Sequence, residues 1–404
     1  MKILQINNVY PFGSTGKIVK EIHEGLLNTN YESIVCYAEG NSIKEQNVYK
    51  ISSVFVQKID AIISRITGLM YGGCIIQTIK IISIIKKEKP NVVHIHCING
   101  HTVNIYRLIE WLKKNRIKTI ITLHAEFIYT ANCGYSLDCD KWKYGCGKCP
   151  RLKKETKSIF FDNTHLSWKK MYSSFKGFNN LQIVSVSPWL KNRAIDSPIL
   201  KEFNHSIILN GLNTEIFKAY NTQELRQKLG LENKKIILHV TPFFCNDKNH
   251  IKGGYYIIEL AKMIKDDNIQ ILVAGKYDLD IDIPNNITLL GNIDDQQQLA
   301  QYYSMSDVFV ITSKKETFSM TTAESLCCGT PVVGFKAGAP EQITINEYSE
   351  FVEYGNLNEL YSEIMNYLSQ DKDYKLEKYA KEKYSKEKMI KNYIKLYKEI
   401  GKGE

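Results

Sequence analysis

Short runs of apolar, mostly β-branched residues alternate along the whole chain with segments whose apolar residues recur every three or four positions. The short runs are typical of buried strands in a parallel sheet, and the longer segments predict helices that cover its faces. Ten runs predict strands: KILQIN, SIVCYA, NVVHIHC, KTIITLH and QIVSVS in the first half, and KIILHVT, IQILVAG, ITLLGNI, VFVITS and PVVGF in the second. Each half is therefore expected to form a doubly wound, Rossmann-like α/β domain.

The length of the chain supports a division into two domains. A chain of 404 residues is too long for one ordinary hydrophobic core. We predict an N-terminal domain over residues 1–205, a C-terminal domain over residues 206–385, and a final helix over residues 386–404 that packs back on the N-terminal domain. Two parallel sheets facing a central cleft would bind ligands there, at the carboxyl ends of their strands.

The most apolar stretch runs from Lys58 to Lys89, and Asp60, Arg65 and Lys80 interrupt it. Each of these charges would be costly at the centre of a bilayer, so the stretch predicts one or two amphipathic helices rather than a membrane span. At the N-terminus, the first two residues lead directly into a strand without a small-residue cleavage pattern. The protein is therefore expected in the cytoplasm.

Positive charges gather in the first half of the chain. Lysine and arginine number 53 against 43 acidic residues, which gives a net charge of +10. The runs KKEK, KKNRIK, RLKKETK and WKK either form solvated faces or, on one side of a domain, attract phosphates and anionic lipid. Because no recognised nucleic-acid module is present, we expect no nucleic acid partner. An anionic membrane surface is the alternative, with the protein peripheral on the inner face.

Four of the ten cysteines, Cys133, Cys139, Cys146 and Cys149, lie within one loop over residues 133–149. The last two form a C-x-x-C pair, and four thiolates can complete a tetrahedral zinc site. Such a site would be structural, because it leaves no open coordination position for water. Reduced or partly paired thiols are the alternative, since the first pair has the wide spacing C-x5-C.

The first loop, VYPFGSTGKIV, is rich in glycine and contains a Gly-Lys pair. A P-loop needs four residues between its glycines and a hydroxyl after the lysine. Here only two residues separate Gly13 from Gly16, and Ile18 follows Lys17. The pattern instead predicts a strand, a tight turn and a helix whose N-terminus suits an anion. A compact turn without a ligand is equally compatible with it.

The stretch SKKETFSMTTAESLCCGTPVVGF carries the clearest candidate chemistry. Glu316 follows a predicted strand, and Thr321-x-x-Glu324 has the pattern of a capping box that starts a helix. Gly329 and Pro331 would end that helix. Two acids beside the free N–H groups of a helix start suit a ligand with hydroxyls at both ends and phosphates in the middle, such as a nucleotide sugar. A cap and a solvated acid would also explain the spacing.

The order of motifs resembles the retaining glycosyltransferases of family 4, which have the GT-B fold. The order is NGLNTEIF, KGG, LVAG, LLGNI, the stretch around Glu316 and then AGAPE, and Glu316 with Glu324 matches the E-x7-E signature of that family. In the first half, GSTGKI, VVHIHCINGH, ITLHAEF and the cysteine loop look like a bacterial subgroup that builds exopolysaccharide, capsule or O-antigen chains. The resemblance runs through nearly the whole chain.

The resemblance implies a role for each matching residue. Glu316 would face the donor sugar hydroxyls, Glu324 would hold the ribose, and Lys252 would neutralise the diphosphate leaving group. His124, at the end of a predicted strand, matches the histidine near the reacting sugar, but Ala125 follows it where the family often has Asp. Further donor contacts are expected from Gly13, Gly16, Lys248, Phe318, Ser319 and Met320.

The function implied by the resemblance is transfer of a sugar from a UDP- or GDP-linked donor to a growing, lipid-linked saccharide. No cofactor is expected for catalysis, because Lys252 and a helix N-terminus can carry the diphosphate charge. Two other classes stay open. A nucleotide-sugar epimerase or a phosphorylase would share the architecture and use no separate saccharide acceptor. A zinc-bearing scaffold would keep the cysteine loop and bind no nucleotide.

Overall fold

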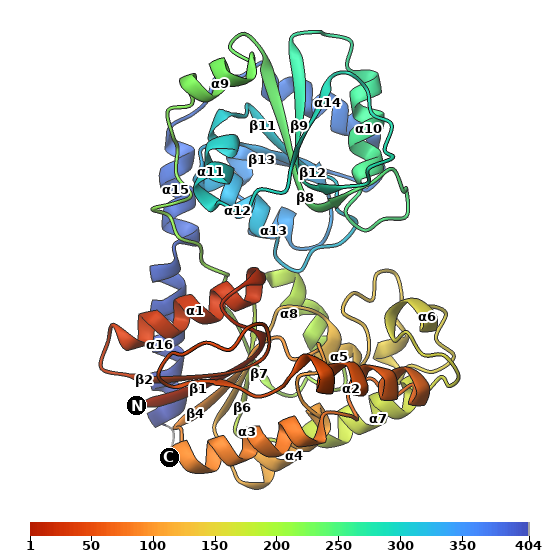
Figure 1. Ribbon diagram of the computed structural model, residues 1–404, viewed down its shortest axis with the longest axis vertical. Helices are drawn as coiled ribbons and strands as arrows, with labels where there is room; N and C mark the ends of the chain where they lie inside the picture. The colour runs from red at the N-terminus through yellow and green to blue at the C-terminus, as the bar shows by residue number, and fades with distance from the viewer. Residues whose placement is uncertain (403–404) are drawn as a thin grey trace. The chain divides into compact units, whose positions relative to one another are not determined.

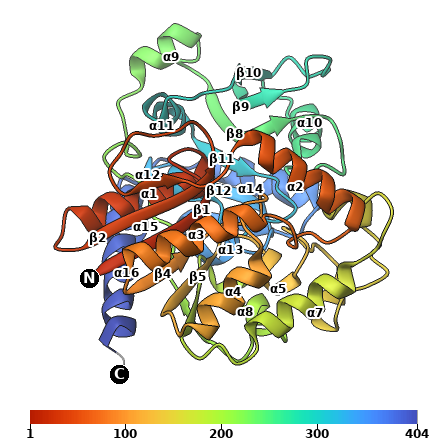
Figure 2. The same cartoon turned by 60° about the horizontal axis from the view of Figure 1, so that its bottom comes forward.

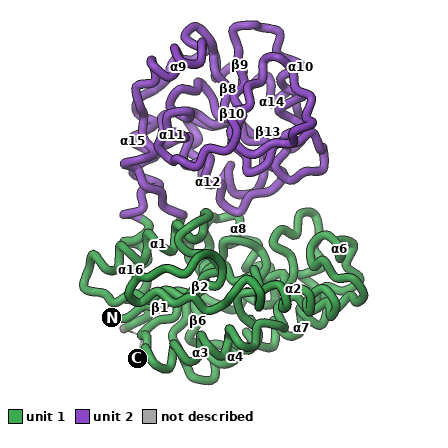
Figure 3. Tube along the Cα trace, in the orientation of Figure 1, with its two compact units in different colours: residues 1–209, 389–404 green, residues 210–388 purple. Residues whose placement is uncertain are grey.

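The computed structural model describes residues 1–402 and shows two compact units (Figure 3). The first unit contains residues 1–209 and the chain from Met389 onward, and the second contains residues 210–388. The chain thus leaves the first unit once and returns to it near the C-terminus. The boundaries expected from the sequence lie after residues 205 and 385.

The first unit is built on a parallel sheet in the order β3-β2-β1-β4-β5-β6-β7, and Figure 1 shows helices packed around its strands. β1 lies in the interior of this sheet, paired in parallel register with β2 on one side and β4 on the other. Every residue of β4 and β5 is buried, because helices cover both faces of a doubly wound sheet. The strands are β1 (Lys2–Val9), β2 (Glu32–Glu39), β3 (Val48–Lys50), β4 (Val92–Ile95), β5 (Thr119–Leu123), β6 (Leu181–Ser185) and β7 (Asn204–Ile207).

Helices of the first unit come from both ends of the chain. α1 and the C-terminal part of α16 share one hydrophobic core with the sheet, through Ile22, Val92 and Tyr397 among others, and α4 packs against α3 and α7. The helices are α1 (Gly13–Leu27), α2 (Val54–Thr67), α3 (Ile75–Glu88), α4 (Ile105–Lys114), α5 (Phe127–Thr130), α6 (Leu152–Glu155), α7 (Thr164–Phe175), α8 (Pro188–Ile195) and α16 (Lys386–Lys402), with a 3-10 turn η1 at Lys141–Lys143.

The apolar stretch from residue 58 to residue 89 forms two separate helices, α2 and α3, as the sequence predicts. Figure 2 brings both helices to the front of the first unit. Within residues 1–402, no helix combines the length and the apolar character needed to cross a membrane.

The second unit contains a parallel sheet in the order β10-β9-β8-β11-β12-β13. Helices α10 and α14 pack into one core with this sheet, whereas α12 contacts α11 and α15. The strands are β8 (Lys235–Phe244), β9 (Ile269–Tyr277), β10 (Ile287–Gly291), β11 (Val308–Ile311), β12 (Val332–Phe335) and β13 (Ser349–Val352). The helices are α9 (Gln223–Leu229), α10 (Gly254–Met263), α11 (Gln296–Met305), α12 (Met320–Cys327), α13 (Pro340–Ile343), α14 (Leu357–Leu368) and α15 (Lys375–Tyr384), with a 3-10 turn η2 at Asn346–Tyr348.

All ten predicted strands are present, and the two parallel sheets confirm the predicted α/β fold class. Three strands were not predicted, namely β3, β7 and β13, and each of them lies at the edge of its sheet. Two of the three, β3 and β7, are largely exposed or half-buried. They therefore lack the continuous apolar run that marks a central parallel strand.

Candidate active site

A lysine and a glutamate meet at the carboxyl end of β11. Lys252 Nζ lies 2.6 Å from Glu316 Oε1, and the two side chains are only 24% and 12% exposed. Glu316 belongs to the loop between β11 and α12, and Lys252 lies just before α10. The fold of the second unit therefore brings together two of the residues that the sequence analysis names as catalytic, 64 positions apart in the chain.

Both backbones around this ion pair are anchored. Glu316 N–H donates to the Ala337 carbonyl at 2.9 Å, and Ala339 N–H donates back to the Glu316 carbonyl at 3.2 Å. On the other side, Thr312 Oγ1 donates to the Gly253 carbonyl at 3.0 Å. Gly253 has a φ of +69°, and a Cβ atom there would lie 2.1 Å from the Thr312 carbonyl oxygen. Only glycine lets the chain before α10 approach β11 this closely.

Ser319 starts helix α12, and its Oγ accepts a hydrogen bond from Thr322 N–H at 3.3 Å. Its φ of +78° is uncommon for a residue other than glycine. The predicted capping box Thr321-x-x-Glu324 is therefore wrong, because the turn at Ser319 has already begun the helix before Thr321. Glu324 engages another element, since its Oε2 accepts from the Tyr303 hydroxyl at 3.1 Å.

The other donor residues predicted in the second unit lie close in the sequence either to Glu316 or to Lys252. Phe318 is buried and Met320 is half-buried at the start of α12. Lys248 is exposed, with its ammonium 5.7 Å from the ring centre of Tyr255. A helix N-terminus carries a partial positive charge. Lys252, Glu316 and the start of α12 therefore lie at one strand end, a combination that can bind phosphates and hydroxyls.

His124 follows β5 in the first unit and lies within a chain of buried histidines. His124 Nε2 is 3.2 Å from His96 Nδ1, and His96 Nε2 is 3.2 Å from Gln5 Oε1. Burial lowers the pKa of His124 to about 4, so its ring is neutral near pH 7. A neutral imidazole can donate or accept one hydrogen bond to a sugar hydroxyl without adding positive charge.

The glycine-rich turn begins α1 in the first unit. Phe12 is the N-cap residue and supplies no side-chain hydrogen bond to the helix start. Gly16 is buried against β1, where a Cβ atom would lie 3.2 Å from the Val9 carbonyl oxygen. Close packing of helix on strand thus accounts for Gly16, and the predicted contacts of Gly13 and Gly16 with a diphosphate stay predictions.

Glu126 lies two positions after His124, and its carboxylate is fully buried. Its Oε1 accepts from Arg193 Nε at 2.8 Å, and its Oε2 accepts from Ser136 N–H. The Arg193 guanidinium lies 5.1 Å from the ring centres of both Trp142 and Trp189. Sequence analysis missed this cluster, because Arg193 of α8 lies 67 positions from Glu126 in the chain.

The four clustered cysteines line one small cavity of the first unit. Burial raises the pKa of Cys146 to about 12 and raises the pKa of Cys133 and Cys149. Among residues 1–402, no group of three or more histidine, cysteine or acidic side chains is arranged to hold a metal ion. The four thiols line the same cavity but are not arranged as metal ligands. The zinc site stays a prediction.

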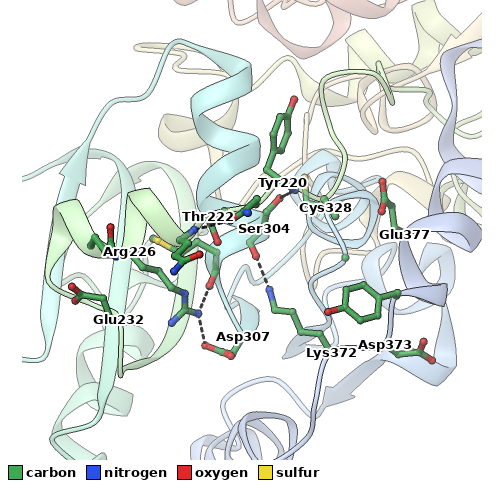
Figure 4. Close-up of a pocket in the computed structure, with 17 residues that line it drawn as sticks. Tyr220, Thr222, Arg226, Glu232, Ser304, Asp307, Cys328, Lys372, Asp373 and Glu377 are labelled. Atoms are coloured by element: carbon green, nitrogen blue, oxygen red, sulfur yellow. Dashed lines mark hydrogen bonds and ion pairs between the residues drawn. The ribbon is translucent and has the colours of Figure 1, made fainter.

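Figure 4 shows a larger cavity of about 610 Å³ in the second unit. It lies at the amino end of β11, whereas Glu316 follows the carboxyl end of that strand. Its lining includes Asp307, which directly precedes β11 and pairs with Arg226 at 3.3 Å. Burial lowers the pKa of Lys372 to about 8, and its Nζ donates to the Ser304 carbonyl at 2.6 Å. None of the predicted donor residues, all within the described chain, lines this cavity. It is therefore separate from the candidate active site.

The fold and the site together define a class of protein. Residues 221–392, nearly all of the second unit, match the family model described as glycosyl transferases group 1. The second unit thus carries a group 1 glycosyltransferase domain, and the protein is a glycosyltransferase with the GT-B fold. This confirms the resemblance that the motifs predicted.

Relatives extend this similarity to the first unit. The chain is 21% identical to the putative colanic acid biosynthesis glycosyl transferase WcaC of Escherichia coli K12, over 85% of each chain. Among solved structures, sucrose-phosphate synthase from Thermosynechococcus elongatus superposes with a TM-score of 0.71 at 15% identity and covers 99% of both chains. Anabaena HepE in complex with UDP-glucose gives a TM-score of 0.64 at 14% identity, covering 99% of this chain and all of that one.

Proposed function

We propose that this enzyme transfers a hexose, with retention of configuration, from a UDP- or GDP-sugar to a lipid-linked saccharide in the synthesis of a cell-surface polysaccharide. The observation that carries the proposal is the ion pair of Lys252 with Glu316 at the end of β11, next to the start of α12. The enzyme would act in the cytoplasm, on the inner face of the membrane.

The ion pair is suited to hold both ends of a sugar diphosphate. When the donor enters, Lys252 would exchange the Glu316 carboxylate for a phosphate oxygen, and the start of α12 would add N–H donors to the same group. Glu316 would then accept hydrogen bonds from the sugar hydroxyls, and Glu324 from the ribose. Because the diphosphate gains charge as it leaves, these cationic groups lower the barrier without a metal ion.

Two relatives support the choice of donor and product. HepE has been solved with UDP-glucose, which favours a UDP-hexose, and the name of WcaC places that relative in colanic acid biosynthesis. For the acceptor side, Glu126 is already engaged by Arg193 and the Ser136 N–H. A same-face displacement assisted by the leaving phosphate therefore accounts for retention better than a nucleophilic Glu126.

The proposal is tested by thermal shift and by turnover. We expect UDP or GDP to raise the melting temperature in the presence of EDTA, because a ligand that binds only the folded state stabilises it. Glu316→Gln should keep the fold and lose turnover of the donor. Glu353→Gln is the matched control. Glu353 Oε1 lies 2.5 Å from Lys336 Nζ in an exposed ion pair, so this variant should keep full activity.

Three results would contradict the proposal. Full activity of Glu316→Gln would remove the assigned site. Turnover of the nucleotide sugar at full rate without any acceptor would favour an epimerase. No change of the melting temperature with any nucleotide would favour the zinc-bearing scaffold without nucleotide binding.

A further inference from the structure

Helix α2 is amphipathic in the opposite sense to an ordinary surface helix. Its two buried residues, Asp60 and Ser64, are both polar. Its apolar side chains face solvent with 41% to 72% of their surface exposed, namely Val54, Phe55, Ile59, Ile62, Ile63 and Ile66. A helix of a soluble domain normally turns its apolar stripe to the core, so the exposed face of α2 requires another explanation.

Buried hydrogen bonds hold α2 in this orientation. Asp60 Oδ2 accepts from Gln77 Nε2 at 2.6 Å, and Asp60 Oδ1 accepts from Cys74 N–H at 3.0 Å. Asp60 is 8% exposed and Gln77 is 1% exposed. Rotating α2 to bury its isoleucines would expose these bonds and break them, and a buried carboxylate without partners is costly. The hydrogen bonds of Asp60 therefore keep the apolar face of α2 turned toward solvent.

A second exposed apolar segment joins the end of α2. Ile159 N–H donates to the Arg65 carbonyl at 2.8 Å, and Asn163 Nδ2 donates to the Thr67 carbonyl at 2.6 Å. The residues between them, Ile159, Phe160 and Phe161, are 58% to 69% exposed. We call these three and the six apolar residues of α2 the α2 patch. Single exposed apolar residues are ordinary, but a contiguous patch marks an interaction surface.

The charges around the α2 patch are mainly positive. Segments 54–67 and 151–162 carry six cationic residues, namely Lys58, Arg65, Arg151, Lys153, Lys154 and Lys157, against three acidic ones. Of the acids, Asp60 is buried, Glu155 pairs with Arg151, and Asp162 accepts from the Cys149 and Thr164 N–H groups. An apolar face with a cationic rim complements an anionic lipid surface, whereas two copies placed face to face would oppose like charges.

We propose that the α2 patch docks the enzyme on an anionic bilayer, with α2 lying in the plane of the lipid headgroups. The 14 residues of α2 rise about 21 Å, less than the ~30 Å hydrocarbon core, so this helix lies on the membrane rather than across it. This inference rests on the proposed function, in which the acceptor is carried on a lipid. The docked first unit stays beside that acceptor while the second unit binds the soluble donor.

The test is flotation of the full chain with vesicles of phosphatidylcholine and phosphatidylglycerol at a 3:1 ratio, compared with pure phosphatidylcholine. We expect binding only to the anionic vesicles. Phe55→Ser with Ile62→Ser should lower the affinity at least tenfold. Lys58→Ala with Arg65→Ala should lower it about fivefold per charge at low salt, with the loss shrinking at high salt.

The matched control is Leu279→Ser with Tyr374→Ser, which removes side chains that are 87% and 89% exposed in the second unit. This variant should bind vesicles as the parent protein does. All variants should keep the melting temperature and the shift with UDP or GDP, so that a failure of docking is distinguished from a failure of the proposed donor site.

Two outcomes would overturn the docking proposal. One is vesicle binding by Phe55→Ser with Ile62→Ser that equals the parent protein. The other is a dimer in sedimentation that the same variant abolishes while neither protein binds vesicles, which would assign the α2 patch to a second copy of the chain.

Discussion

At the scale of single residues, the ion pair of Lys252 and Glu316 is a structural contact at the proposed donor site. The two side chains are mostly shielded from water and lie 2.6 Å apart. Removing one partner of a buried pair leaves the other unpaired, which is destabilising. Here the donor phosphate would replace the lost carboxylate for Lys252, so the two residues should respond differently to substitution.

Lys252→Met should weaken donor binding about 10- to 100-fold, because a charge-assisted bond to phosphate contributes roughly 1.5–3 kcal/mol. Glu316→Gln should instead lower kcat with a smaller change in nucleotide affinity. Calorimetric titration with UDP and with GDP measures the first effect. Lys336→Met, which removes the cation of an exposed pair, is the control, and equal losses in both lysine variants would show that Lys252 has no special role.

The buried histidines make the first unit sensitive to acid. Burial lowers the pKa of His94, His96 and His124 below their ordinary value of 6.5. Between about pH 6.5 and pH 4 the unfolded chain binds protons that the folded unit does not, so stability falls as the pH falls, by up to about 1.4 kcal/mol per pH unit for each histidine.

Melting temperatures measured from pH 7.5 to pH 4.5 test this expectation. His124→Asn removes one titrating group and should flatten the curve below pH 6.5. A curve of unchanged slope in that variant would mean that His124 is already charged in the folded protein.

At the scale of elements, glycines at chosen turns decide how closely the elements pack. Gly253 and Gly230 both have positive φ, at +69° and +65°. A Cβ atom at Gly253 meets the Thr312 carbonyl, whereas a Cβ atom at Gly230 meets nothing within 4 Å. The two positions therefore separate the cost of backbone strain from the cost of a steric clash.

Gly230→Ala should cost about 1–2 kcal/mol of unfolding free energy, since alanine is strained in the left-handed region. Gly253→Ala should cost more, because the clash adds to the strain, and it should also weaken UDP binding by displacing Lys252. Denaturant unfolding of both variants measures the difference. Equal losses of unfolding free energy in the two variants would mean that the loop before α10 shifts enough to relieve the clash at Gly253.

The cysteine loop gives a second test at this scale. If Cys133, Cys139, Cys146 and Cys149 hold structural zinc, the purified protein contains one zinc per chain, and Cys146→Ser with Cys149→Ser loses both the metal and solubility. Elemental analysis measures the metal content. Cys97→Ser, outside the cluster, is the control. A zinc-free parent protein with an unaffected double variant would identify the four cysteines as reduced thiols.

At the scale of the whole molecule, the end of the chain completes the core where the chain began. α16 brings Met389, Tyr393 and Tyr397 into the core of the first unit, all at most 2% exposed. The Tyr397 hydroxyl lies 2.7 Å from His94 Nδ1 across 303 positions of sequence. The stability of the first unit therefore depends on residues that follow the complete second unit in the chain.

Tyr397→Phe should lower the free energy of unfolding of the first unit by about 1–3 kcal/mol, because it leaves a buried ring nitrogen of His94 without its partner. Tyr374→Phe, at an 89% exposed position, should have little effect. Calorimetric melting of both variants measures the change. A loss confined to Tyr397→Phe would show that α16 is an integral part of the first unit.

Local pattern explains how much of the fold could be predicted. The central strands are largely apolar and buried, because both faces of the sheet are covered, and the ten predicted strands include all of them and the edge strand β10. The edge strands β3, β7 and β13 have at most four residues each. Length alone does not set them apart, because the predicted strands β4, β11 and β12 also have four residues each. Those three are buried throughout, whereas β3 and β7 are largely exposed or half-buried and lack a continuous apolar run.

The sequence by itself determined the α/β class, ten of the strands, which include every central one, and the glycosyltransferase motifs, because each depends on residues that are neighbours in the chain. Only the tertiary structure decided that Lys252 pairs with Glu316, that Glu126 is held by Arg193, and that Asp60 turns the apolar face of α2 outward. These contacts join residues 17 to 67 positions apart. Which residues form these pairs depends on which helices and strands pack next to one another. The local pattern of apolar and polar residues contains no information about that packing.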